Sequence, residues 1–109
     1  MGRQDALQSA LEVMVLKIVS RQLRMHGYAI IAAIADISQG VLRVEEGSLY
    51  PALRRMEESG WLRAEWVTRE AGRRARMYQV TAAGRKQLAA AESRWQAGTA
   101  AVNRVLRMA

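Results

Sequence analysis

A chain of 109 residues forms one compact domain, or one domain with a long arm, and leaves no room for a catalytic domain beside a regulatory one. It contains no cysteine, which excludes disulfides, thiolate zinc sites and cysteine nucleophiles, and its single histidine excludes a multi-histidine metal site. Half of the residues are apolar, so the chain can fold, and 17 basic against 10 acidic residues (net charge +7, isoelectric point near 11.0) indicate a polyanionic partner.

The sequence predicts neither a membrane anchor nor an export signal. The longest unbroken apolar run, residues 29–35, is far shorter than the roughly 20 residues that span a bilayer. Arg3, Gln4 and Asp5 stand where a signal peptide leads into a smooth apolar stretch. We therefore expect a cytoplasmic protein.

Two helices are predicted in the first 40 residues. The first covers residues 5–23, where apolar residues recur at helical spacing on two stripes, so we expect this helix to be covered on two sides. The second covers residues 28–38, with His26 in the turn that precedes it and Gly40 as a left-handed C-terminal cap.

Within residues 44–53, acidic residues and a serine are predicted to precede a third helix, which ends at Ser59-Gly60. Its face for the core contains Leu49, Leu53 and Met56. Pro51 is expected in the first turn, where a proline is tolerated. Four polar or aromatic residues lie mostly off the core face: Ser48, Tyr50, Arg54 and Arg55.

Residues 61–67 and 76–80 alternate in the manner of two strands, and the polar loop between them contains Gly72 and three arginines. This pattern predicts a β-hairpin with a basic tip. We expect Trp61 and Trp66 to belong to the hydrophobic core.

The last predicted helix covers residues 82–107, with Thr81 as N-cap. At about 1.5 Å per residue it reaches nearly 40 Å, too long to pack along one small domain. Residues spaced by sevens, with smaller residues between them, predict a short coiled-coil seam: Leu88, Ala91, Trp95, Gly98, Val102 and Val105.

Three helices followed by a two-stranded hairpin is the element order of a winged helix-turn-helix, in which the third helix enters the major groove and the hairpin lies on the flanking backbone. The charge supports this, because residues 61–86 contain seven basic and two acidic residues, a net charge of +5. The predicted fold class is mainly α (α+β). We expect residues 1–80 to form the DNA-binding domain with a two-stranded wing, its N-terminal helix also in dimer contact, and residues 81–109 to form a long C-terminal dimerisation helix.

Five segments together resemble the PadR family of bacterial transcriptional regulators: His26–Ile30, Glu46–Glu57, Gly60–Leu62, Arg74–Tyr78 and Thr81–Lys86. The run Gly-Ser-Leu-Tyr-Pro-Ala-Leu at residues 47–53 is the most specific of these motifs. The resemblance implies a winged-helix homodimer, usually a repressor, and the single helix before Ala109 is similar to the short branch of the family.

The resemblance also implies roles for individual residues. Ser48, Tyr50 and Arg54 match positions on the recognition helix of the family. Three arginines fall in the wing: Arg73, Arg74 and Arg76. The dimer contact would involve both terminal helices, and therefore Leu7, Leu11 and Met14 beside the C-terminal seam. In some short-branch members a tryptophan lines a pocket for flat aromatic effectors, and Trp95 is the candidate here.

Several of these residues have an alternative structural role. Ser48 is either an N-cap or a phosphate contact, and Tyr50 either packs sideways against the hairpin or reaches DNA. Arg54 either binds guanine O6 and N7 or pairs with Glu58 four residues on. Arg55 is expected to be solvated or to contact the DNA backbone.

We expect a sequence-specific, homodimeric repressor that binds an inverted-repeat operator, with double-stranded DNA and a second copy as partners. Two alternatives stay open: a ligand-sensing dimer with an aromatic effector at Trp95, and a winged-helix protein–protein adaptor. We expect no enzyme, cofactor or metal, because the neighbouring carboxylates Glu57 and Glu58 diverge on a helix, as do Glu45 and Glu46.

Overall fold

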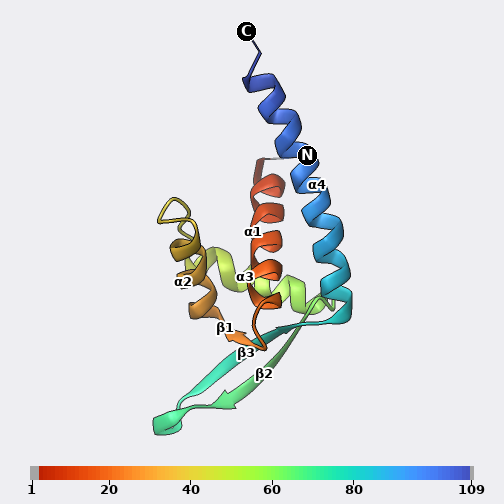
Figure 1. Ribbon diagram of the computed structural model, residues 1–109. Coiled ribbons are helices and arrows are strands. Elements are labelled where there is room, and N and C mark those ends of the chain that lie inside the picture. Colours follow the sequence, from red (N-terminus) through yellow and green to blue (C-terminus); the bar gives the residue numbers. More distant parts are fainter. Residues whose placement is uncertain (1–2, 109) are drawn as a thin grey trace.

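The computed structural model describes residues 3–108, with side chains from residue 9 onward. Four helices and a three-stranded sheet make up the fold, which confirms the predicted mainly α class (Figure 1). In chain order the elements are α1 (Arg3–Ser20), β1 (Met25–His26), α2 (Gly27–Ile37), α3 (Glu46–Glu58), β2 (Leu62–Thr68), a 3-10 turn (Glu70–Gly72), β3 (Arg74–Val80) and α4 (Ala82–Leu106).

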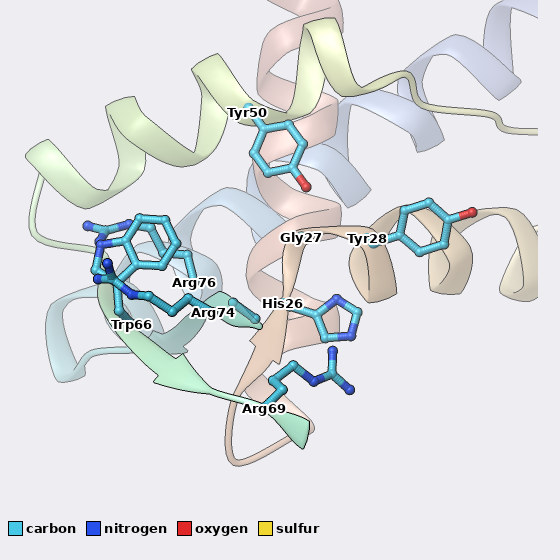
Figure 2. A pocket seen from close by; sticks show the side chains of 9 residues that line it. His26, Gly27, Tyr28, Tyr50, Trp66, Arg69, Arg74 and Arg76 are labelled. Carbon is cyan, nitrogen blue, oxygen red and sulfur yellow. The ribbon is translucent and has the colours of Figure 1, made fainter. Parts of the chain in front are cut away.

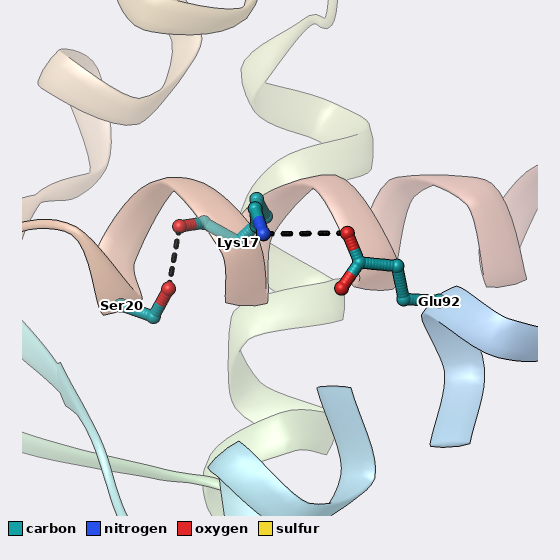
Figure 3. Close-up of polar contacts among 3 residues, drawn as sticks. All are labelled: Lys17, Ser20 and Glu92. Atoms are coloured by element: carbon teal, nitrogen blue, oxygen red, sulfur yellow. Dashed lines mark hydrogen bonds and ion pairs between the residues drawn. The ribbon is translucent and has the colours of Figure 1, made fainter. Parts of the chain in front are cut away.

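Helix α1 is the central element. It contacts α2, α3, α4 and β3, and its Val15, Leu16 and Val19 are fully buried, which confirms the prediction that it is covered on two sides. The helix begins and ends earlier in the chain than predicted. It ends at Ser20, whose hydroxyl donates to the carbonyl of Lys17 at 2.7 Å (Figure 3). Leu23, beyond its end, is 80% exposed.

Contacts between the N-terminal and C-terminal helices support this arrangement. Lys17 on α1 forms an ion pair with Glu92 on α4, with 3.3 Å between nitrogen and oxygen (Figure 3). Leu88 and Ala91 of α4 are buried, and Leu88 belongs to the same core cluster as Leu11. These residues, which the sequence assigned to the dimer seam, are therefore largely covered within one chain.

The sheet has the order β1-β3-β2 and is antiparallel throughout. The strand β1 was not predicted, and the interpretation of His26 as a turn residue is wrong. His26 pairs with Met77 in the sheet and also caps α2, because its Nδ1 accepts a hydrogen bond from Ala29 N at 3.2 Å.

The hairpin β2–β3, which we call the wing (residues 62–80), projects from the body (Figure 1). Its base is buried at Leu62, Tyr78 and Val80. Trp66 shares a face with Leu62 but is 54% exposed, so its expected place in the core is wrong. Trp66 lies past the buried base of the wing, where the strand no longer packs on the core. Trp61 is half-buried against the core.

Helix α3 begins earlier than its motif suggested. Its N-cap is Glu45, without a side-chain cap bond, so Ser48 is not the N-cap. Pro51 is the sixth helical residue and lies in the second turn, not in the first as predicted. The proline is tolerated there because the carbonyl left without a partner belongs to Gly47, at the exposed start of the helix.

Helix α4 confirms the predicted cap and length. Thr81 Oγ1 accepts from Gly84 N at 3.0 Å, and Gly84 lies against the carbonyl of Trp61. The second half of the helix projects away from the domain (Figure 1), and the chain extends to 60 Å along its longest axis.

Candidate nucleic-acid interface

The buried residues of α3 determine which of its side chains face outward. Leu49, Leu53 and Met56 are fully buried, and this fixes the rotation of the helix. As predicted, four residues are exposed on the opposite side: Ser48, Tyr50, Arg54 and Arg55. No ion pair to Arg54 is found within residues 9–108, so the alternative pairing with Glu58 is absent there.

Tyr50 packs against the start of α2, on the side of α3 that faces the hairpin. A Cβ atom added at Gly27 would lie 2.7 Å from the Tyr50 ring and 2.8 Å from its hydroxyl. The ring therefore rests on the bare Cα of Gly27, while 41% of the residue stays exposed (Figure 2). Glycine at position 27 holds the hydroxyl at the surface between two helices.

A groove runs between α3, the start of α2 and the wing, and we call it the α3–wing groove. Its basic end is lined by His26, Gly27, Tyr28, Tyr50, Trp66, Arg69, Arg74, Ala75 and Arg76 (Figure 2). Its other end, which shares Tyr50, Trp66 and Arg76, adds Arg54, Glu57, Glu58 and Tyr78. Three elements far apart in the sequence thus form one concave surface with three arginines at one end.

The basic end contains donors that the sequence analysis did not identify. The Nδ1 atom of His26 accepts the cap bond from Ala29, so in the neutral ring Nε2 carries the proton and can donate to an anion. Arg69 and Tyr28 lie at the same end (Figure 2). In the sequence, the one indication that His26 could act as a donor is its position directly before Gly27, at the start of α2. The sequence does not show that His26 lies beside the wing, which depends on the fold.

The wing arginines differ in their surroundings. Arg73 and Arg74 are exposed, and the Arg74 guanidinium lies 4.7 Å from the centre of the Trp66 ring. Arg76 lies 5.3 Å from the same ring and forms an ion pair with Glu57 at 2.7 Å. The exposed tryptophan therefore orders two guanidinium groups through its π face.

Tyr78 lies below this cluster at the base of the wing. Burial raises the pKa of its hydroxyl above the ordinary value of 10.0, and the positive charge of Arg76 acts in the opposite direction. The phenol is therefore neutral at pH 7 and serves as part of the core beneath the groove.

A second exposed surface lies on the projecting half of α4. Trp95 is 52% exposed, and Gly98, Val102 and Val105 are exposed on the same helix. Met14 is half-buried on α1. Leu7, the remaining residue of the predicted dimer contact, lies outside the residues whose side chains are described.

Within residues 3–108, no helix combines the length and the apolar character that a membrane span requires. Among residues 9–108, whose side chains are described, no three His, Cys, Asp or Glu side chains gather where they could hold a metal ion.

Comparison with known proteins decides the family. A sequence profile of the transcriptional regulator PadR-like family matches residues 15–90. The chain belongs to this family. This confirms the resemblance found in the sequence, and because PadR members are transcriptional regulators and not enzymes, it also supports the expectation that the chain has no catalytic activity.

Solved structures agree in fold over nearly the full length. A PadR-like transcriptional regulator from Bacillus cereus is 26% identical, with a TM-score of 0.79 and coverage of 96% of this chain and 99% of that one. A PadR family regulator from Eggerthella lenta is 28% identical (TM-score 0.78, coverage 95% and 88%). A transcriptional regulator from Clostridium thermocellum, at 21% identity, shares the fold (TM-score 0.83, coverage 92% and 96%). A comparison with curated proteins found no match.

Proposed function

We propose that this PadR-family chain is a homodimeric repressor that binds double-stranded DNA at an inverted-repeat operator. The observation that carries the proposal is the α3–wing groove, where an exposed helix face and an arginine-rich hairpin border one concave surface. In a winged helix, the third helix reads base edges and the hairpin contacts the adjacent backbone.

The exposed side chains divide by role. Arg54 lies free on the outer face of α3, where its guanidinium can bind guanine O6 and N7, and Arg55 lies beside it. Tyr50 and Ser48, near the start of α3, are assigned to phosphate oxygens. Arg73 and Arg74 of the wing are assigned to the flanking phosphates, and His26 and Arg69 to the strand that passes the basic end of the groove.

The partner copy is assigned to the projecting half of α4. Trp95, Val102 and Val105 are exposed there, and the C-terminal part of the helix projects beyond the other described elements (Figure 1). A second copy would cover this apolar face, and two-fold symmetry would place two reading heads on one face of the DNA. Repressors of this kind act on chromosomal DNA, so we propose a cytoplasmic location.

A mobility-shift titration tests the DNA-binding part of this proposal. DNA from upstream of the gene itself should bind in preference to a scrambled duplex, and log K should fall with log salt with a slope of about −0.9 for each phosphate neutralised. Equal, salt-independent affinity for both duplexes would contradict DNA binding and favour a protein–protein adaptor.

A second function is supported by the exposed ring of Trp95. If the dimer forms through α4, two tryptophans from two chains approach each other, and a flat aromatic effector can insert between them. A variant in which Trp95 is the one remaining tryptophan should lose fluorescence on titration with planar aromatic compounds. Unchanged fluorescence at saturating concentrations would contradict this role.

A further inference from the structure

Glu57 and Arg76 connect the recognition helix to the wing. The Glu57 carboxylate on α3 accepts a hydrogen bond from the Arg76 guanidinium on β3 at 2.7 Å. The side chains are 33% and 32% exposed, so the pair is partly shielded from water. It joins the two elements that border the α3–wing groove.

Arg76 has a second partner that fixes its guanidinium further. Arg76 and Trp66 are opposite each other in the β2–β3 register, and the guanidinium lies 5.3 Å from the ring centre. Arg74 stacks on the same ring but is exposed on the wing surface. The donors of Arg76 are thus directed toward Glu57, whereas those of Arg74 can turn toward solvent.

The wing needs such a connection because its outer half has no core beneath it. Trp66 is mostly exposed, and an isolated two-stranded ribbon is marginally stable and twists easily. An ion pair at the middle of the ribbon restricts its angle to α3, and that angle sets whether helix and wing can meet one DNA duplex together.

We propose that Glu57 strengthens DNA binding, although it is an acidic residue on the helix that faces DNA. It does so as a positioning residue: it holds Arg76, and Arg76 holds the wing, so that neither needs to contact DNA. This inference rests on the DNA-binding function proposed above and assigns Arg76, grouped by sequence with the phosphate contacts, to a different role.

Whether the substitution Glu57→Gln raises or lowers the affinity for DNA tests the inference. Glu57→Gln removes a negative charge beside DNA, and long-range electrostatics alone would tighten binding. We expect the opposite, a loss of about fivefold in affinity, because a neutral amide holds the Arg76 guanidinium more weakly than the carboxylate does. The matched control is Glu58→Gln, which makes the same charge change one residue on, at an exposed position of the same groove. Its affinity should be equal to that of the unaltered chain or higher.

The salt dependence of DNA binding is a second measurement. It distinguishes a residue that positions the wing from a residue that contacts phosphate. Arg76→Gln should weaken binding while the salt slope stays unchanged, whereas Arg74→Gln should reduce the slope by about 0.9. The charge-swapped variant, Glu57→Arg with Arg76→Glu, should bind DNA more tightly than the variant with Glu57→Arg alone or with Arg76→Glu alone.

Amide hydrogen exchange of the free protein reports on the wing without DNA. It should increase in β2 and β3 for Glu57→Gln and not for Glu58→Gln.

The outcomes separate this inference from the function on which it rests. If the unaltered chain binds no DNA, both fail. If it binds DNA, but Glu57→Gln binds as tightly as Glu58→Gln with unchanged wing exchange, or Arg76→Gln loses salt slope as Arg74→Gln does, the positioning role is overturned and DNA binding stands.

Discussion

The Tyr50 ring rests on the Cα of Gly27, and a methyl group at that glycine would come within 2.7 Å of the ring. Position 27 begins α2 and position 50 lies on α3, so this contact sets the distance between the two helices at the basic end of the α3–wing groove. Position 27 requires a glycine because a side chain there would collide with the Tyr50 ring. The backbone conformation of α2 does not itself require one.

We predict that Gly27→Ala weakens DNA binding about fivefold and leaves thermal stability almost unchanged. The partly exposed ring can swing outward at little cost, but its hydroxyl then leaves the proposed phosphate position. Titration of Gly27→Ala, Tyr50→Ala and the double variant measures this. If Gly27 acts through Tyr50, the glycine substitution adds nothing in the Tyr50→Ala background, and additive losses would contradict the prediction.

The exposed wing arginines should behave as phosphate contacts. Replacing Arg73 and Arg74 together by alanine should weaken binding to all DNA sequences alike and reduce the salt slope by about 1.8, which corresponds to two phosphates. Arg107→Ala, at the far end of the chain from the wing, serves as control and should retain the full slope (Figure 1). A change in sequence preference at constant slope would contradict the assignment.

The exposed face of α4 should carry the dimer. Trp95→Arg places a charge in the proposed seam and should convert dimers to monomers in sedimentation velocity. Gln96→Arg adds the same charge at the next position, turned off the seam, and should remain dimeric. A dimeric Trp95→Arg variant with native helix content would show that the interface lies elsewhere.

Position 84, in the first turn of α4, should tolerate no side chain. A Cβ atom at Gly84 would collide with the backbone carbonyl of Trp61, and backbone atoms cannot turn aside. We predict that Gly84→Ala destabilises the fold by about 1–3 kcal/mol in urea unfolding. Gly47→Ala, with open space around its Cβ position, should be neutral or stabilising, because alanine favours a helix. Equal stability of the two variants would contradict the packing described.

Tyr78 should make the fold sensitive to alkaline pH. Its pKa is raised by burial in the folded chain and returns to about 10 on unfolding, so the unfolded state loses this proton first as pH rises. The stabilising contribution is therefore complete below pH 10 and is lost as pH rises through the folded pKa. Unfolding free energies of the unaltered chain and of Tyr78→Phe, measured from about pH 8 to about pH 11, should diverge above pH 10. Parallel curves would contradict the shift.

Periodicity and end signals predicted the helices, the hairpin, the Thr81 cap and the left-handed Gly40, because these depend on neighbours within one or two turns. The strand β1 has only two residues and shows no periodicity of its own. Alternation placed Trp66 on the correct face of β2, but it does not show where the underlying core ends. The start of α3 was misplaced because Glu45 caps without a side-chain bond.

The sequence predicted many of the residues that belong to the site, but not which of them contact each other. The exposure of Tyr50 and Arg54 could be predicted, because the helical pattern in the sequence puts Leu53 on the core face and these two residues off that face. The Tyr50–Gly27 contact and the Glu57–Arg76 pair join positions 23 and 19 residues apart, and only the packing of α2, α3 and the wing brings them together.

Hydroxyl-radical footprinting of the unaltered protein on DNA from upstream of its own gene tests the central claim most directly. A dimer with two α3–wing surfaces should protect two equivalent backbone segments, related by two-fold symmetry and centred about one or two helical turns (~34–36 Å each) apart. Protection of a single segment, or none at concentrations where the protein is dimeric, would contradict it.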